Sequence, residues 1–186
     1  MNWRVQVKKK VAKNFLKLPK AVQQALEALA ADIRESGPIR GDWPNYSKLS
    51  DGSHHCHLSY SYVAVWTVID DKIRIVEVTY VGSRENAPYE KARAIETLLK
   101  ETPTHKDTEL VDIGEIFPHL NDPEKMPAIT FRGIRAKTGL TQKEVAKRLG
   151  ITQAEVSKIE CGKRSIGKAL SKRIEKEFKI DYRRFL

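Results

Sequence analysis

Only two cysteines, Cys56 and Cys161, occur in this chain of 186 residues, and they lie far apart. A disulfide framework is therefore not expected, and a reducing cytoplasm is the expected compartment. Long apolar runs are also missing, since no stretch approaches the roughly 18–20 residues that a membrane-spanning helix needs. The N-terminus, MNWRVQVKKK, has charges but no apolar core after them, so no secretory signal is expected. The sequence predicts a globular protein without a membrane partner.

Charge is abundant but unevenly spread, with a net total of +10. Residues 1–100 hold 16 Lys and Arg against 11 Asp and Glu, a balance of +5. Residues 101–130 hold 2 against 7, a balance of −5, and residues 131–186 hold 16 against 6, a balance of +10. Basic domains favour nucleic-acid partners, and an acidic connector between them could cover a basic surface. The alternative is a merely solvated linker.

The pattern of residues 1–100 predicts a small α+β domain. Alternation over residues 3–7 indicates a strand, and an apolar face of helical period follows. Pro19 divides that face into two helices, about 9–17 and 19–36. Three strand-like runs come next, at about 54–58, 62–69 and 72–81, and a third helix is expected over 89–100. Helices on one face of a small antiparallel sheet are the expected architecture.

Residues 131–186 predict an all-α domain whose centre is a helix, a short turn and a second helix. Thr141 and Thr152 can cap the two helices, and Gly150 can end the first. This arrangement places a second helix in the major groove of DNA. The side chains that face outward on that helix suit base edges, and two cations follow where a phosphate strand would pass. They are Gln153, Ala154, Ser157 and Lys158, followed by Lys163 and Arg164.

The stretch LTQKEVAKRLGITQAEVSKIECGKR resembles the helix-turn-helix family of the lambda-type (XRE-type) repressors. The likeness covers about residues 129–186 and implies that Gln142 and Thr152 contact phosphates. The ending KRIEKEFKIDYRRFL is similar to the tail of antitoxin repressors of this kind. Operator DNA with a palindromic sequence, bound by a homodimer, is the partner that this resemblance implies.

Residues 1–95 resemble the RelE-type toxins, which cut mRNA on the ribosome. The likeness lies in DWPNYSKLS, HHCHL, YVAVWTVIDDKIRIVEVTYVGSREN and APY. It departs from the family at Val63 and Ala64, which stand where many members have an arginine that binds phosphate. Toxins of this sort are usually encoded beside a separate antitoxin, whereas this one chain resembles both.

Cleavage of RNA without a metal needs a base, a cation for the phosphate and a donor for the leaving oxygen. A strand would direct His55 and His57 to one face and His54 and Cys56 to the other. One short strand therefore cannot wrap a tetrahedral zinc ion, and no metal or other cofactor is expected. Comparable residues do this work in the toxin family, which makes the candidate catalytic set His55, His57, Arg84, Tyr89 and Lys48.

The acidic connector carries apolar residues that need a surface: Ile113, Ile116, Phe117 and Leu120. We expect this segment to inhibit the toxin by covering the groove around Arg84. The resulting hypothesis is a self-neutralised toxin–antitoxin fusion with a toxin domain (1–100), a neutralising connector (101–130) and a DNA-binding domain (131–186) that represses its own operator. Two alternatives stay open: a transcriptional regulator with an inactive toxin-like sensor or dimerisation domain, and a ParE-type gyrase inhibitor on the same fold.

Overall fold

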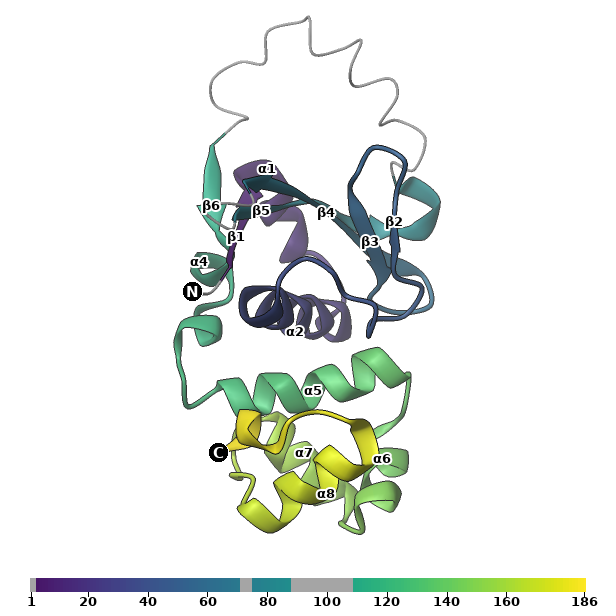
Figure 1. The fold of residues 1–186 in the computed structure, drawn as a ribbon, viewed down its shortest axis with the longest axis vertical. Helices are drawn as coiled ribbons and strands as arrows, with labels where there is room; N and C mark the ends of the chain where they lie inside the picture. Colours follow the sequence, from purple (N-terminus) through teal and green to yellow (C-terminus); the bar gives the residue numbers. More distant parts are fainter. Residues whose placement is uncertain (1–2, 71–74, 88–108) are drawn as a thin grey trace, which may run out of the picture.

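The computed structural model describes residues 3–70, 75–87 and 109–186 (Figure 1). The front half runs β1 (Arg4–Lys8), α1 (Lys9–Phe15), α2 (Lys20–Ser36), β2 (Ser47–Lys48), β3 (His54–His57), β4 (Tyr62–Asp70), β5 (Ile75–Ser83) and the 3-10 helix η1 (Arg84–Asn86). After the gap come β6 (Leu110–Asp112), α4 (Ile113–Ile116) and η2 (Pro118–Asn121), then α5 (Met126–Thr138), α6 (Gln142–Leu149), α7 (Gln153–Glu160), α8 (Lys168–Phe178) and η3 (Tyr182–Phe185). The helix expected over 89–100 lies outside the described residues.

The strands form one six-stranded sheet in the order β2-β3-β4-β5-β1-β6. The pairs β2–β3, β3–β4 and β4–β5 are antiparallel as expected, but β1 runs parallel to β5, so the sheet is mixed. The parallel pair arises because α1 and α2 return the chain across the sheet before the antiparallel strands begin. Val5 and Val7 of β1 are fully buried and pack with Leu26, Leu29 and Ile33 of α2. The front half is therefore a sheet with packed helices, an α+β arrangement.

Residues 109–121, here called the strap, belong to the front half. β6 adds to the free edge of β1 in antiparallel register, with Val111 opposite Val7. Arg34 of α2 binds the strap at two points. It forms an ion pair with Asp112 and donates a hydrogen bond to the Leu120 carbonyl oxygen over 3.1 Å. Three strap side chains enter the front core: Ile113, Phe117 and Leu120. No strand was predicted here, because three residues are too few for an alternating pattern to be visible.

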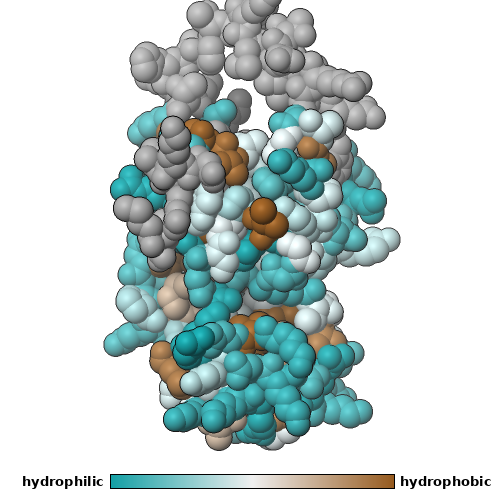
Figure 2. Space-filling view, in the orientation of Figure 1, coloured by the Kyte–Doolittle hydropathy of each residue, from teal (hydrophilic) through white to brown (hydrophobic). Residues whose placement is uncertain are grey.

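Helix α2 lies between the sheet and α5, and so it is buried on both faces (Figure 1). Its larger apolar side chains face the sheet. Small ones meet α5, where Gly133 approaches so closely that an added Cβ would come within 3.3 Å of the Ala28 Cβ. Apolar side chains are visible at this seam between the upper and lower halves, above a largely hydrophilic lower surface (Figure 2). The front domain (residues 3–87 and 109–121) and the helical domain (126–186) are thus packed together.

No helix in the described ranges combines the length and the apolar character needed to cross a membrane.

The strap predicts a measurable contribution of Phe117 to the stability of the front domain. Phe117→Ala removes a core side chain and should lower the free energy of unfolding by about 3–5 kcal/mol. Leu110→Ala, at a partly exposed strap position, is the control and should cost less than about 1 kcal/mol. All three tryptophans, Trp3, Trp43 and Trp66, lie in the front domain, so urea unfolding followed by their fluorescence reports this domain. Equal effects of the two variants would contradict the described packing.

Candidate nucleic-acid interface

The two helices α6 and α7 begin with the same device. Thr141 and Thr152 each accept a hydrogen bond from the backbone N–H three residues on, and the Glu144 and Glu155 carboxylates each accept one from the backbone N–H of the cap residue. Both ends are therefore complete capping boxes. Gly150 closes α6 in a left-handed conformation with φ 61°, as glycine allows at low cost. The predicted caps and stop are confirmed, and the turn between the helices is short.

The outer side of α7 is open. Gln153, Ala154 and Lys158 are exposed and Ser157 is half-buried, whereas Val156 and Ile159 on the inner side are buried. Lys163 and Arg164 are exposed just beyond α7, and Arg164 pairs with Glu155. All the side chains expected to face DNA on this helix and after it are thus within reach of solvent.

A buried carboxylate fixes the first helix of this unit against the second. Glu160 accepts two hydrogen bonds from Arg135, at 2.6 and 3.0 Å, and a third from Gln142 at 2.8 Å. The bonds join the end of α7 to α5 and to the first residue of α6. Gln142 is therefore held at the N-terminus of α6, where free backbone N–H groups favour a phosphate. Phe185 of the C-terminal tail packs into the same core, while Leu186 is exposed.

Residues 131–185 match the family model described as helix-turn-helix. No curated protein and no solved structure matches the chain. The match and the capped pair α6–α7 agree on the same residues. This part of the chain is a helix-turn-helix DNA-binding domain, the kind of domain that transcriptional regulators use.

The histidine-rich strand β3 divides its side chains as predicted. His54 and Cys56 are buried in the front domain, and His54 is sandwiched by rings: it hydrogen-bonds the Tyr46 hydroxyl over 2.8 Å and stacks against Trp66. Burial lowers the pKa of His54 and raises that of the Cys56 thiol. These two residues are core groups. His55 and His57 lie together on the other face, with ring centroids 6.1 Å apart.

His57 and Arg84 meet in a cleft between the two domains. The cleft has a volume of about 390 Å³ and is lined by Pro44, Asn45, His57, Ser59, Tyr60, Arg84, Ala136, Lys137, Thr138 and Gly139. Burial lowers the pKa of His57 below its ordinary value, and the charge of Arg84 lowers it further. The lowered pKa favours the neutral imidazole, which is the form that can accept a proton.

The other catalytic candidates take different places. His55 lies beside His57, and its Nδ1 is 2.9 Å from the Ser47 hydroxyl oxygen. Lys48 is exposed on β2, opposite His54, and does not line the cleft. Tyr89 lies outside the described residues. The structure thus brings His57, Arg84 and neighbouring His55 together and leaves Lys48 to one side.

Sequence reasoning missed two residues of the cleft. Asn45 adopts a left-handed backbone conformation, φ 49°, which is uncommon outside glycine and is tolerated best by Asn and Asp. Tyr60 is 93% exposed at the tip of the β3–β4 connection. An aromatic ring at a turn between two strands was the available signal, because such a ring has no packing reason to be there.

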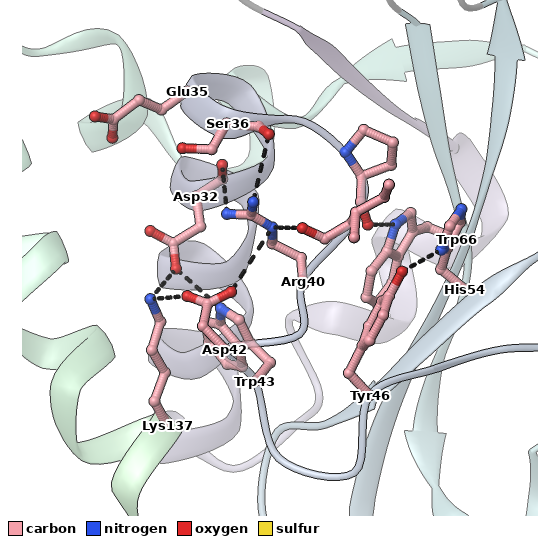
Figure 3. A network of polar contacts seen from close by, with 12 residues as sticks. Asp32, Glu35, Ser36, Arg40, Asp42, Trp43, Tyr46, His54, Trp66 and Lys137 are labelled. Carbon is pink, nitrogen blue, oxygen red and sulfur yellow. Dashed lines mark hydrogen bonds and ion pairs between the residues drawn. The ribbon is translucent and has the colours of Figure 1, made fainter. Parts of the chain in front are cut away.

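Buried charges join the two domains along α2 (Figure 3). Asp32 is buried and contacts Lys137 of α5 over 2.7 Å, Arg184 of η3 over 2.9 Å and the Trp43 indole nitrogen over 2.9 Å. Burial pushes the pKa of Asp32 up, but Lys137 and Arg184 outweigh it and hold the pKa below its ordinary value. One turn earlier, Glu27 pairs with Arg132 over 2.7 Å. The carboxylates are on the front domain and the cations on the helical domain.

The cleft is walled by α5 and not by the strap. The strap residues Ile113, Phe117 and Leu120 are buried at the β6 edge of the sheet, and Ile116 packs beside them, whereas His57 belongs to β3 near the opposite edge. The side chains expected to cover the Arg84 groove serve the front core. The last residues of α5 and its cap residue, from Ala136 to Gly139, line the cleft instead.

The open face of α7 predicts that two lysines contribute differently to DNA binding. Lys158→Ala should relax base preference at one position by about 1–3 kcal/mol, because a base contact carries sequence information. Lys163→Ala should weaken all sequences similarly and reduce the salt dependence by about one phosphate contact. Selection from a randomised duplex pool, followed by sequencing, measures the first effect. Unchanged base preference in Lys158→Ala would show that Lys158 does not contact a base.

Proposed function

We propose that the chain is a self-neutralised toxin–antitoxin fusion: a latent metal-independent endoribonuclease held inactive by the DNA-binding domain to which it is joined. The observation that carries the proposal is the cleft in which His57 and Arg84 face residues 136–139, the end of α5 and its cap residue. One side of this cleft supplies groups for cutting RNA, and the other side is the helix-turn-helix domain.

The chemistry follows from the groups in the cleft. A neutral His57 accepts the 2′-hydroxyl proton, and Arg84 stabilises charge that develops on the phosphate. Tyr60, exposed at the rim, offers a ring on which a single-stranded base can stack. His55 supports the position of His57 from the same strand face. The substrate class is single-stranded RNA, in line with the resemblance of residues 1–95 to toxins that cut mRNA on the ribosome.

Neutralisation on this view is steric and runs through α5. Lys137 is held by Asp32 and by Asp42, with Nζ–Oδ distances of 2.7 and 2.6 Å, and lies 5.7 Å from the centre of the Trp43 ring. These contacts keep residues 136–139 against the cleft. Only four residues, 122–125, separate η2 from α5, so the tether keeps the local concentration of α5 high.

On the DNA side, the proposal is autorepression by a homodimer. Proteins of this class bind palindromic operators whose half-sites lie about 10 base pairs apart, because two recognition helices enter successive major grooves. The operator would lie in the chain's own promoter, as for antitoxin repressors that the tail resembles.

Gly133→Leu tests neutralisation in the full chain. A leucine cannot fit against Ala28, so the domains should separate, while helix α5 itself gains propensity. We expect bacteria that make Gly133→Leu to stop growing and to accumulate cleaved mRNA, and Gly133→Leu with His57→Ala to grow, because loss of a general base costs roughly 10²–10⁴ in rate. Separation of the domains is checked by a red shift of the tryptophan emission, which is expected because Trp43 loses its contact with Lys137.

Ala169→Leu, at an exposed position of α8, is the matched control and should leave growth unchanged. If cells grow although the two domains of Gly133→Leu have separated, the ribonuclease proposal is wrong. Arrest with DNA-damage signalling and intact mRNA would instead favour a ParE-type gyrase inhibitor.

One observation favours a second candidate, a transcriptional regulator whose front domain is an inactive sensor or dimerisation module. Val63 and Ala64 stand where many toxins carry a phosphate-binding arginine, and both are fully buried. For such a protein, His57→Ala and Arg84→Ala would change no growth phenotype in the separated Gly133→Leu background.

A further inference from the structure

The front domain reaches the part of the helix-turn-helix unit that meets a DNA strand. Ser59, Tyr60 and Arg84 line the cleft together with Thr138 and Gly139. Ser59 and Tyr60 also line a second hollow that includes Gly139 and Leu140. Gly139 ends α5 in a left-handed turn, and Thr141 then caps α6. The β3–β4 connection and Arg84 therefore stand beside the N-terminus of α6.

Arg84 differs from the other cations near this seam in having no carboxylate partner among the described residues. Arg132 pairs with Glu27, Arg135 with Glu160 and Lys137 with Asp32. Arg84 is exposed, begins the 3-10 helix η1, and has its backbone fixed by an N–H bond to the Ser61 carbonyl oxygen over 2.8 Å. An exposed guanidinium without an ion-pair partner in the described residues, on a backbone that is held in place, is suited to a phosphate, which it can bind with two N–H groups.

The first helix of a helix-turn-helix pair crosses the DNA backbone, and its N-terminus carries partial positive charge. Any strand held there by Gln142 continues past the loop that precedes α6. We propose that the front domain takes part in DNA binding, with Arg84 contacting a backbone phosphate of the duplex next to the one held at the α6 N-terminus. The occupant is duplex DNA, and the contact is independent of base sequence.

The packing of α2 against α5 sets the position of Arg84 relative to the helix-turn-helix unit. Glu27–Arg132 and Asp32–Lys137 fix the front domain on α5, and α5 is joined to α7 by Arg135 and Glu160. The backbone of Arg84 is thus placed relative to the recognition helix before DNA binds, and only the Arg84 side chain has to be ordered. This inference depends on DNA binding by the helix-turn-helix domain and on the packing of α2 against α5, and not on ribonuclease activity.

The test is the salt dependence of DNA binding by the full chain. The probe is a fluorescent duplex of about 30 base pairs, three helical turns, of random sequence. Loss of one phosphate contact lowers the slope of log K against log salt by about 0.9. For each bound chain, Arg84→Ala should therefore reduce the slope by that amount and weaken binding about eightfold near 0.1 M salt. Arg84→Lys keeps the charge and should retain the slope.

Lys13→Ala is the matched control, because Lys13 is exposed on α1 and no α1 residue lines the cleft. It should leave the slope unchanged. An unaltered slope for Arg84→Ala, or equal losses for Arg84→Ala and Lys13→Ala, would overturn the contact. Because the readout is binding to DNA, it is separate from the growth and mRNA readouts of Gly133→Leu.

Discussion

The place of the helical domain depends on one carboxylate that is buried and still charged. Taking a carboxylate out of water costs several kcal/mol, and Asp32 tolerates this because Lys137, Arg184 and the Trp43 indole surround it. Two of these partners come from the helical domain, at the end of α5 and in the C-terminal tail. If the domains separated, the Asp32 carboxylate would lose Lys137 and Arg184 as partners. The contact therefore selects one register of α5 on α2.

Because of this contact, α2 and α5 each serve two parts of the structure. One face of α2 completes the front core and the other receives α5, whose end walls the cleft with His57 and Arg84. The same α5 leads directly into the helix that begins with Gln142. A shift of α5 would therefore move both the wall of the cleft and the start of α6.

The sequence predicted local features well and long-range ones poorly. Thr141, Gly150 and Thr152 act within one helical turn, so their pattern was sufficient to place α6 and α7. The face pattern of α2 revealed only the side that meets the sheet. Nothing in that pattern indicated that Glu27, Ala28 and Asp32 are covered, because the helix that covers them begins about a hundred residues later.

Pairings between distant segments were missed for a related reason. The parallel register of β1 with β5 and the addition of β6 join residues that no local pattern connects. His57 and Arg84 could be predicted as cleft residues from their chemistry. Asn45 and Tyr60 could not, because their place in the cleft depends on the shape of the two turns that carry them. The cleft is lined by the end of α5 and not by Phe117, because Phe117 packs on an apolar surface within its own domain.

The β6 edge of the sheet sets the order in which the protein can be completed during synthesis. β1 is made first, but its outer neighbour and the three strap side chains of its core come only with residues 110–121. At 5–20 residues per second, the ribosome needs about 2–7 s to pass from the end of η1 to the end of the strap. The front core is therefore finished only shortly before α5 emerges, and a newly made cleft would have little time uncovered.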